Sequence, residues 1–241
     1  MDRRNTHDSK SSITFEIIIC NMIWLIIKKE LLQEIRSKES VLSMVVFGIA
    51  VIMLIAFSID LTQSNMIQIM PGIFWLTYLF SAVIGLLRSF GSEKEMNAFG
   101  MLLSSPIDRG NIYIGKMIAV WVFIGITQLV TIPLFTIIFG FSIQGNLIAF
   151  IGFIMLTDWA LAAVGTSVSG IGMRTRMGEV LVPMLLYPML SPVLISAVKV
   201  TGELMRGGEY INYSFWIMII FTFSVVFSIA GYLTFDTISE E

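Results

Sequence analysis

Six long apolar segments, separated by short polar stretches, constrain this chain more than any other feature of its sequence. They lie near residues 41–59, 69–87, 112–139, 147–171, 180–200 and 213–235. Each has about the 20 residues that an α-helix needs to cross the hydrocarbon core of a bilayer. Only 13% of the residues are charged, which is too few to cover the surface of a soluble domain. The sequence therefore predicts an all-α integral membrane protein with six transmembrane helices.

The residues before the first span divide into two parts. Residues 1–12 are polar and are predicted to be a disordered tail. In residues 13–40, apolar side chains recur at helical spacing opposite charged ones. The unbroken apolar run there is about half the length that a span requires. This pattern predicts an amphipathic helix lying in the membrane interface, with a short additional span as the alternative.

The distribution of basic residues predicts how the chain is oriented. Of the 15 Lys and Arg residues, all but Lys199 and Arg206 flank the spans on one side. Basic residues favour the cytoplasmic side of a membrane. We therefore expect a multi-pass protein of an inner membrane with both termini in the cytoplasm, including the short tail 236–241.

The segment Gly91–Lys116 is the longest interruption between two spans and carries both signs of charge. Residues 98–103 have the pattern of one or two helical turns, and Ser105 and Pro106 end them. Asp108 then stands where a helix N-cap belongs, just before the next apolar run. A short amphipathic helix between two cytoplasmic flanks can bind a soluble partner and transmit that partner's conformational change to the adjoining spans. The segment is predicted to be a coupling element in the membrane half of a transporter.

Gly110, Gly115 and Lys116 have the same spacing as the glycines and lysine of a phosphate-binding loop. The following residue is Met117, where a nucleotide site would need Ser or Thr, and no strand precedes the motif. We interpret Lys116 as an interfacial anchor whose ammonium reaches the membrane surface. An energy source such as ATP is therefore expected on a partner subunit.

The fourth predicted span contains Asp158 near its middle. A carboxylate at that depth is costly, so it should face protein or water rather than lipid. It either joins neighbouring helices or lines a translocation path. After it, Ala162, Thr166 and Gly170 recur every fourth residue, which lets another helix approach closely.

The fifth predicted span contains Pro183, Pro188 and Pro192. Each proline removes a backbone hydrogen bond and disfavours helix just before it. A broken or re-entrant helix near the translocation path is expected here, with a simple kink as the alternative.

The composition also limits the chemistry and the partners of the chain. His7 is the single histidine and Cys20 the single cysteine, so a metal site built on His or Cys is not expected, nor is a directly bound cofactor. A net charge of −2 argues against a nucleic-acid partner.

The segment Glu95-Met-Asn-Ala-Phe-Gly-Met-Leu-Leu-Ser-Ser-Pro106 resembles the E-D-G-[ST]-L-E-x-L-L-L-S-P signature of the haem exporter protein B family (CcmB). The proline-rich run 181–195, the Gly115–Lys116 pair and the surface helix before the first span are similar to that family as well. The resemblance covers nearly all of residues 22–237. The chain departs from the signature at Met96, Asn97 and Gly100, where the family has Asp, Gly and Glu.

The resemblance implies an ABC-2-type exporter permease that serves cytochrome c maturation and acts as a homodimer. It implies two copies of a separate ATPase subunit, further cytochrome c maturation membrane subunits, and haem as a possible substrate. In the family the ATPase cycle is tied to haem export or to the release of a haem-loaded chaperone outside. The positions that carry over as coupling residues are Glu95, Asn97, Leu102, Leu103, Ser105 and Pro106, with Asp108 beside them.

Other functions remain compatible with the residues. An ABC-2-type permease for a drug, lipid or glycan would share the whole architecture and differ only in its substrate. A proton-coupled secondary carrier would use Asp158 as its relay, although no internal repeat is visible. An intramembrane enzyme is disfavoured because the spans hold no His or Cys and only one clear acid.

Overall fold

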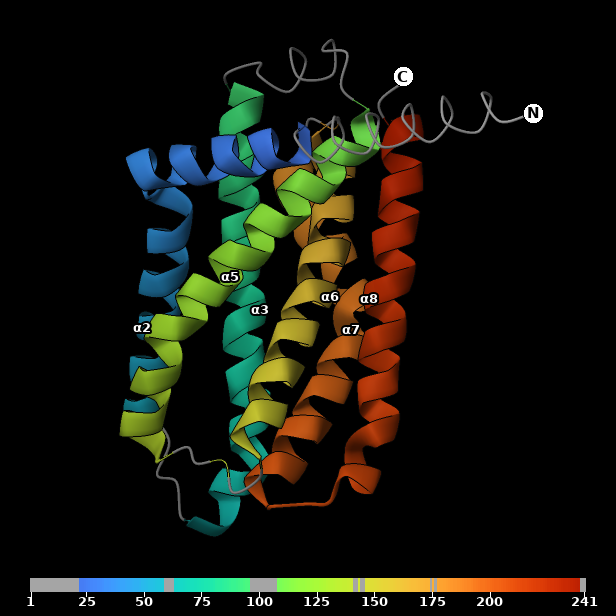
Figure 1. Ribbon diagram of the computed structural model, residues 1–241. Helices are drawn as coiled ribbons and strands as arrows, with labels where there is room; N and C mark the ends of the chain where they lie inside the picture. The colour runs from blue at the N-terminus through green and yellow to red at the C-terminus, as the bar shows by residue number, and fades with distance from the viewer. Residues whose placement is uncertain are drawn as a thin grey trace, which may run out of the picture.

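The computed structural model of the chain is a bundle of helices in the residues that it describes (Figure 1). These are residues 22–58, 63–95, 108–140, 146–173 and 177–238, together with positions 143 and 175. Within them, six helices are long and apolar enough to cross a membrane: α2 (Glu39–Ser58), α3 (Gln63–Glu95), α5 (Arg109–Phe139), α6 (Leu147–Met173), α7 (Gly178–Met205) and α8 (Tyr210–Ile238). The predicted all-α, six-span architecture is confirmed.

A further helix, residues 22–37, lies across one end of the bundle, at the top of Figure 1. Ile26 and Ile27 on its inner face are buried against the spans, whereas Trp24 and Leu25 are exposed. One side of this helix thus packs on protein and another presents apolar side chains outward. Its location in the membrane interface stays a prediction.

The turn from this helix into α2 is fixed by two local features. Lys38 adopts a left-handed φ of 56°, which is uncommon for a residue with a side chain. The carboxylate of Glu34 accepts a hydrogen bond of 2.7 Å from the backbone N–H of Val41. It thereby satisfies one of the free amides in the first turn of α2, where the helix dipole favours negative charge. The chain can therefore leave the crosswise helix and enter the first span within a few residues.

Helix α6 lies at the centre of the bundle and packs against α3, α5, α7 and α8. The small residues predicted to allow close approach do so: Ala162 and Thr166 are fully buried, as is Gly170. A side chain at Gly170 would collide with the ring of Phe235 on α8. The small-residue face of α6 is therefore confirmed as a close-packing surface.

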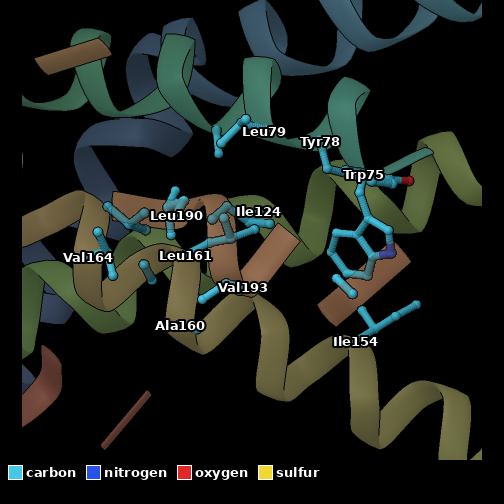
Figure 2. Close-up of a cluster of buried hydrophobic side chains, with 14 of the residues drawn as sticks. Trp75, Tyr78, Leu79, Ile124, Ile154, Ala160, Leu161, Val164, Leu190 and Val193 are labelled. Atoms are coloured by element: carbon cyan, nitrogen blue, oxygen red, sulfur yellow. The ribbon is translucent and has the colours of Figure 1, made fainter. Parts of the chain in front are cut away.

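Large apolar side chains from four helices fill the space around α6 (Figure 2). Trp75 of α3, Ile124 of α5, Leu161 of α6 and Leu190 of α7 are each about 1% exposed. The indole N–H of Trp75 donates a 2.8 Å hydrogen bond to the hydroxyl of Thr201 on α7. These side chains belong to one hydrophobic core, so the core holds α3, α5, α6 and α7 together.

Candidate functional site

The structure describes the two ends of the predicted coupling segment. Glu95 is the last residue of α3, and Asp108 immediately precedes α5. The predicted coupling positions between them, Asn97, Leu102, Leu103, Ser105 and Pro106, lie outside the described residues. The coupling role of the segment stays a prediction, and the described contacts are those that hold its two ends.

Asp108 anchors the end of the segment that leads into α5. Its Oδ1 accepts a hydrogen bond of 3.2 Å from the backbone N–H of Gly110, so the predicted N-cap is confirmed. Its Oδ2 accepts a second hydrogen bond, also of 3.2 Å, from the hydroxyl of Tyr232 on α8. One carboxylate therefore caps α5 and joins its first turn to the last span.

Gly110 and Gly115, whose spacing is similar to that of a phosphate-binding loop, lie in the first turns of α5 and allow other side chains to pack closely. A side chain at Gly110 would collide with the ring of Tyr232, and one at Gly115 would collide with Ile26 of the crosswise helix. The stretch is continuous helix from Arg109 onward. Its backbone amides are therefore committed to the helix, apart from those of the first turn.

Lys116 is buried, so the expectation of an interfacial anchor was wrong. Its side chain is 1% exposed, and its ammonium lies 3.1 Å from the carboxylate of Glu30, which is 5% exposed. The same Glu30 oxygen accepts a hydrogen bond of 3.1 Å from Lys29. The ammonium also lies 4.7 Å from the ring centroid of Phe90 on α3, within the range of a cation–π contact.

This buried charge cluster joins the crosswise helix to both helices that flank the coupling segment. Phe90 lies one and a half turns before the end of α3, and Lys116 lies two turns into α5. Glu30 belongs to the helix 22–37. A displacement of the segment that moves α3 or α5 therefore also acts on the crosswise helix.

Sequence reasoning missed this cluster, although the sequence contained a signal for half of it. Glu30 follows Ile26 by four residues and Ile27 by three, so helical spacing places it on the same face as two buried side chains. An acidic residue on an apolar stripe predicts a buried partner of opposite charge. The identity of that partner depended on how α5 crosses the bundle.

Asp158 lies in the protein interior, as predicted for a carboxylate in a span. It is 1% exposed, and its Oδ1 accepts a hydrogen bond of 2.8 Å from the side-chain amide of Gln128 on α5. Its Oδ2 has no hydrogen-bond partner among the described residues. Asp158 therefore joins α6 to α5, and its second oxygen is buried.

A second polar pair lies close to Asp158. The hydroxyls of Tyr78 on α3 and Thr131 on α5 are 2.7 Å apart, and Thr131 lies three residues after Gln128 on the same face of α5. Together with Gln128, these side chains form a buried polar cluster that spans α3, α5 and α6. Such a cluster can fix helix positions, and its unsatisfied carboxylate oxygen could also take up a proton.

The three prolines of the fifth span lie inside one continuous helix, so the expectation of a broken or re-entrant segment was wrong. Pro192 cannot donate to the carbonyl of Pro188, four residues earlier. The hydroxyl of Ser191 donates to that carbonyl instead, at 2.8 Å. A neighbouring hydroxyl thus replaces a missing backbone donor, which is a recognised way for membrane helices to tolerate proline.

A cleft of about 320 Å³ opens between α3, α6 and α7 at the end of the bundle where the coupling segment begins. Phe90 and Gly91 of α3 line it, together with Ser169 of α6 and Glu179 of α7. The hydroxyl of Ser169 has no hydrogen-bond partner among the described residues. The cleft therefore offers an unsatisfied polar group next to the segment.

Comparison with known proteins identifies relatives over most of the chain. The family model described as CcmB protein matches residues 21–236. Heme exporter protein B of Rhodobacter capsulatus is 26% identical over 162 residues, covering 67% of this chain and 72% of the relative. Heme exporter protein B of Haemophilus influenzae is 27% identical over 181 residues, covering 74% and 81% of the two chains. The protein of that name from Pseudomonas aeruginosa is 23% identical over 176 residues, covering 73% and 78%.

Proposed function

This chain belongs to the CcmB protein family, and on that premise we propose that it is the permease subunit of an ABC exporter serving cytochrome c maturation. In this proposal it couples a separate ATPase to the export of haem or to the release of a haem-loaded chaperone outside. The observation that carries the proposal is the family match, which extends over residues 21–236 and so includes all six spans.

The ends of the segment between α3 and α5 support a coupling role for it. Asp108 caps α5 and bonds to Tyr232 of α8, while Lys116 joins α5 to the crosswise helix. A force applied between Glu95 and Asp108 would thus act on α3, α5, α8 and the helix 22–37. We propose that an ATPase subunit binds this segment through Leu102 and Leu103, with Glu95 at the rim of the contact.

The proposed complex contains two copies of this chain and two ATPase subunits, together with other cytochrome c maturation membrane subunits. Helices α2 and α7 keep large apolar side chains exposed, among them Val46 and Met184. A second copy could cover some of these side chains, and the surrounding lipid could cover the rest. The distribution of basic residues supports an inner-membrane protein with both termini in the cytoplasm.

Haem enters the proposal as substrate and not as a resident cofactor. Haem iron is held by His, Met, Cys or Tyr side chains, and the single histidine, His7, lies outside the spans. In the buried cluster around Asp158 the side chain of one of these types is Tyr78, and its hydroxyl is already hydrogen-bonded with that of Thr131. These residues therefore suit helix packing or proton exchange better than haem ligation.

An ABC-2-type permease for a drug, lipid or glycan is the second candidate. The observation in its favour is that Met96, Asn97 and Gly100 depart from the family signature in the segment that contacts the ATPase. The genes beside this one distinguish the two candidates. Cytochrome maturation genes favour haem, whereas a glycosyltransferase cluster favours a glycan.

Deletion of the gene in its own host tests the proposed function. We expect the covalently bound haem of c-type cytochromes to disappear from membranes and to return when the chain is supplied on a plasmid. Total haem and b-type cytochromes should be unchanged, which serves as the control for haem synthesis. Normal amounts of c-type cytochromes in the deletion strain would contradict the proposal.

A further inference from the structure

Two depressions of different chemistry meet beneath the crosswise helix 22–37. One is a polar cleft of about 830 Å³, bounded by this helix and by the adjoining ends of α2 and α3. The other is a groove of about 460 Å³ between the same helix, α2 and α5, and its walls are almost wholly apolar. Glu34 and Phe123 line both depressions, so the two lie next to each other.

The polar cleft contains two cationic side chains that have no acidic partner in the part of the chain that the structure describes. They are Arg36 of the crosswise helix and Arg88 of α3. The acids nearby are already engaged, since Glu30 pairs with Lys116 and Glu34 caps α2. The remaining acid that lines the cleft, Glu39, lies in the first turn of α2.

The lining contains three basic side chains, Lys29, Arg36 and Arg88, and three acids, and Lys116 behind Glu30 adds a fourth positive charge, so the excess is one positive charge. The dipole at the start of α2 favours the carboxylate of Glu39 where it is, so that carboxylate does not require either arginine as a partner. Two guanidinium groups from different helices line one cleft, and each can donate two parallel N–H bonds to a phosphate group.

The apolar groove supplies the second half of an amphiphile site. Ile35 and Leu42 at its edge are 66% and 58% exposed, and Val41 and Val45 of α2 form its wall. Apolar surface of this extent at the end of a membrane span is stabilised by hydrocarbon rather than by water. The groove is lined by the first turns of α2 and, from α5, by Phe123 and Ile126.

We propose that these depressions form a binding site for one anionic phospholipid from the leaflet at this end of the bundle. The phosphate lies between Arg36 and Arg88, and one acyl chain lies in the groove beside Val41 and Val45. A bound phospholipid would hold the crosswise helix against α2 and α3. It would thereby affect how far the crosswise helix moves when α5 moves, since Glu30 joins these two helices. The inference does not depend on the identity of the exported substrate.

Native mass spectrometry of the full-length chain in detergent tests this site with phosphatidylglycerol as the probe. In the double variant R36Q/R88Q we expect the affinity for phosphatidylglycerol to fall by about thirtyfold. Each basic residue near a membrane surface contributes about 1 kcal/mol of binding free energy, and the variant removes two of them. The matched control is K28Q/K199Q, which removes the same charge outside the cleft and should bind as the unmodified chain does. Thermal melting of each variant shows whether it is folded.

Three further results decide the proposal. The substitution Val45→Trp, which fills the groove and leaves the arginines in place, should weaken phosphatidylglycerol binding without changing the melting temperature. Equal losses in R36Q/R88Q and K28Q/K199Q would overturn the site, since the effect would be general charge. Equal affinity for phosphatidylethanolamine would overturn its anionic selectivity, and equal affinity for glycerol phosphate would show a phosphate site that holds no lipid.

Discussion

The carboxylate of Glu30 and the ammonium of Lys116 lie 3.1 Å apart in the interior of the protein, although 86 residues separate them in the sequence. The pair joins a helix that crosses the end of the bundle to a helix that spans it. Phe90 of α3 adds a cation–π contact to the same ammonium. Three elements thus meet at one charged group beside the proposed coupling segment.

Breaking this pair should destabilise the protein more than removing both charges. We expect Glu30→Gln to cost about 3–5 kcal/mol of unfolding free energy, because it takes the carboxylate away from a buried ammonium. Lys116→Met should cost less, since Lys29 still contacts Glu30. The double variant should be more stable than the sum of the two losses predicts. Thermal melting in detergent measures these effects, and strictly additive losses would show that the two groups do not interact.

Asp158 is predicted to act mainly as a link between α6 and α5. Asp158→Asn retains an oxygen that can accept the hydrogen bond from Gln128, so stability and assembly should change little. Asp158→Leu leaves that buried amide without its acceptor and should cost about 1–3 kcal/mol. Melting temperatures and cytochrome maturation are measured for both variants. Loss of maturation in the Asn variant, with folding and ATPase binding intact, would show a functional role for the charge.

The double substitution Leu102→Asp and Leu103→Asp should abolish co-purification of the ATPase while leaving membrane insertion unchanged. Two carboxylates in an apolar contact would have to be desolvated without partners. The matched control is M96D/G100E, which adds the same charge at positions where the family signature is acidic and should retain the ATPase. Full recovery of the ATPase with the Leu variant would disprove the proposed contact.

Association of two copies is tested by cross-linking of single cysteines in a Cys20→Ser background. Val46 of α2 and Met184 of α7 are 56% and 71% exposed, and a cysteine at either position should trap dimers if that face meets a second copy. Met44 of α2 is 1% exposed, so a cysteine there is the control and should remain monomeric. Monomers alone from both exposed positions, in native membranes, would contradict a homodimer formed through α2 or α7.

Ser191 should contribute more to stability than a serine on a membrane helix usually does. Its hydroxyl bonds to the carbonyl of Pro188, whose normal backbone donor is absent at Pro192. We expect Ser191→Ala to cost about 1 kcal/mol of unfolding free energy. Ser214 makes the same type of bond to Ile211, near the start of α8 and away from any proline. Ser214→Ala is therefore the control. Equal losses of unfolding free energy in the two variants would contradict the proposal that the Ser191 hydroxyl replaces the backbone donor missing at Pro192.

The features that sequence reasoning predicted correctly depend on local physics. Segment length and hydrophobicity decide whether a helix crosses a bilayer, so the six spans could be found without a structure. The cap at Asp108 depends only on the residues that follow it. The burial of Asp158 followed from the cost of a carboxylate in contact with lipid.

The features that were missed depend on partners distant in sequence or on a detail of geometry. Lys116 looked like a surface residue because its partner, Glu30, belongs to another element. The hydroxyl of Ser191 compensates for Pro192 within α7, and its direction cannot be read from the number of prolines. The polar cleft between Arg36 and Arg88 arises from how the crosswise helix lies on the bundle.

The sequence separation of Glu30 and Lys116 also sets an order of events during biosynthesis. At roughly 5–20 residues per second, a ribosome adds Lys116 roughly 4–17 seconds after Glu30. Through that interval the crosswise helix has Lys29 beside its acid but lacks the partner on α5. Its final attachment must wait until the third span has entered the membrane. The nascent chain therefore passes through a stage in which two spans have been made and the crosswise helix still lacks its ion pair to α5.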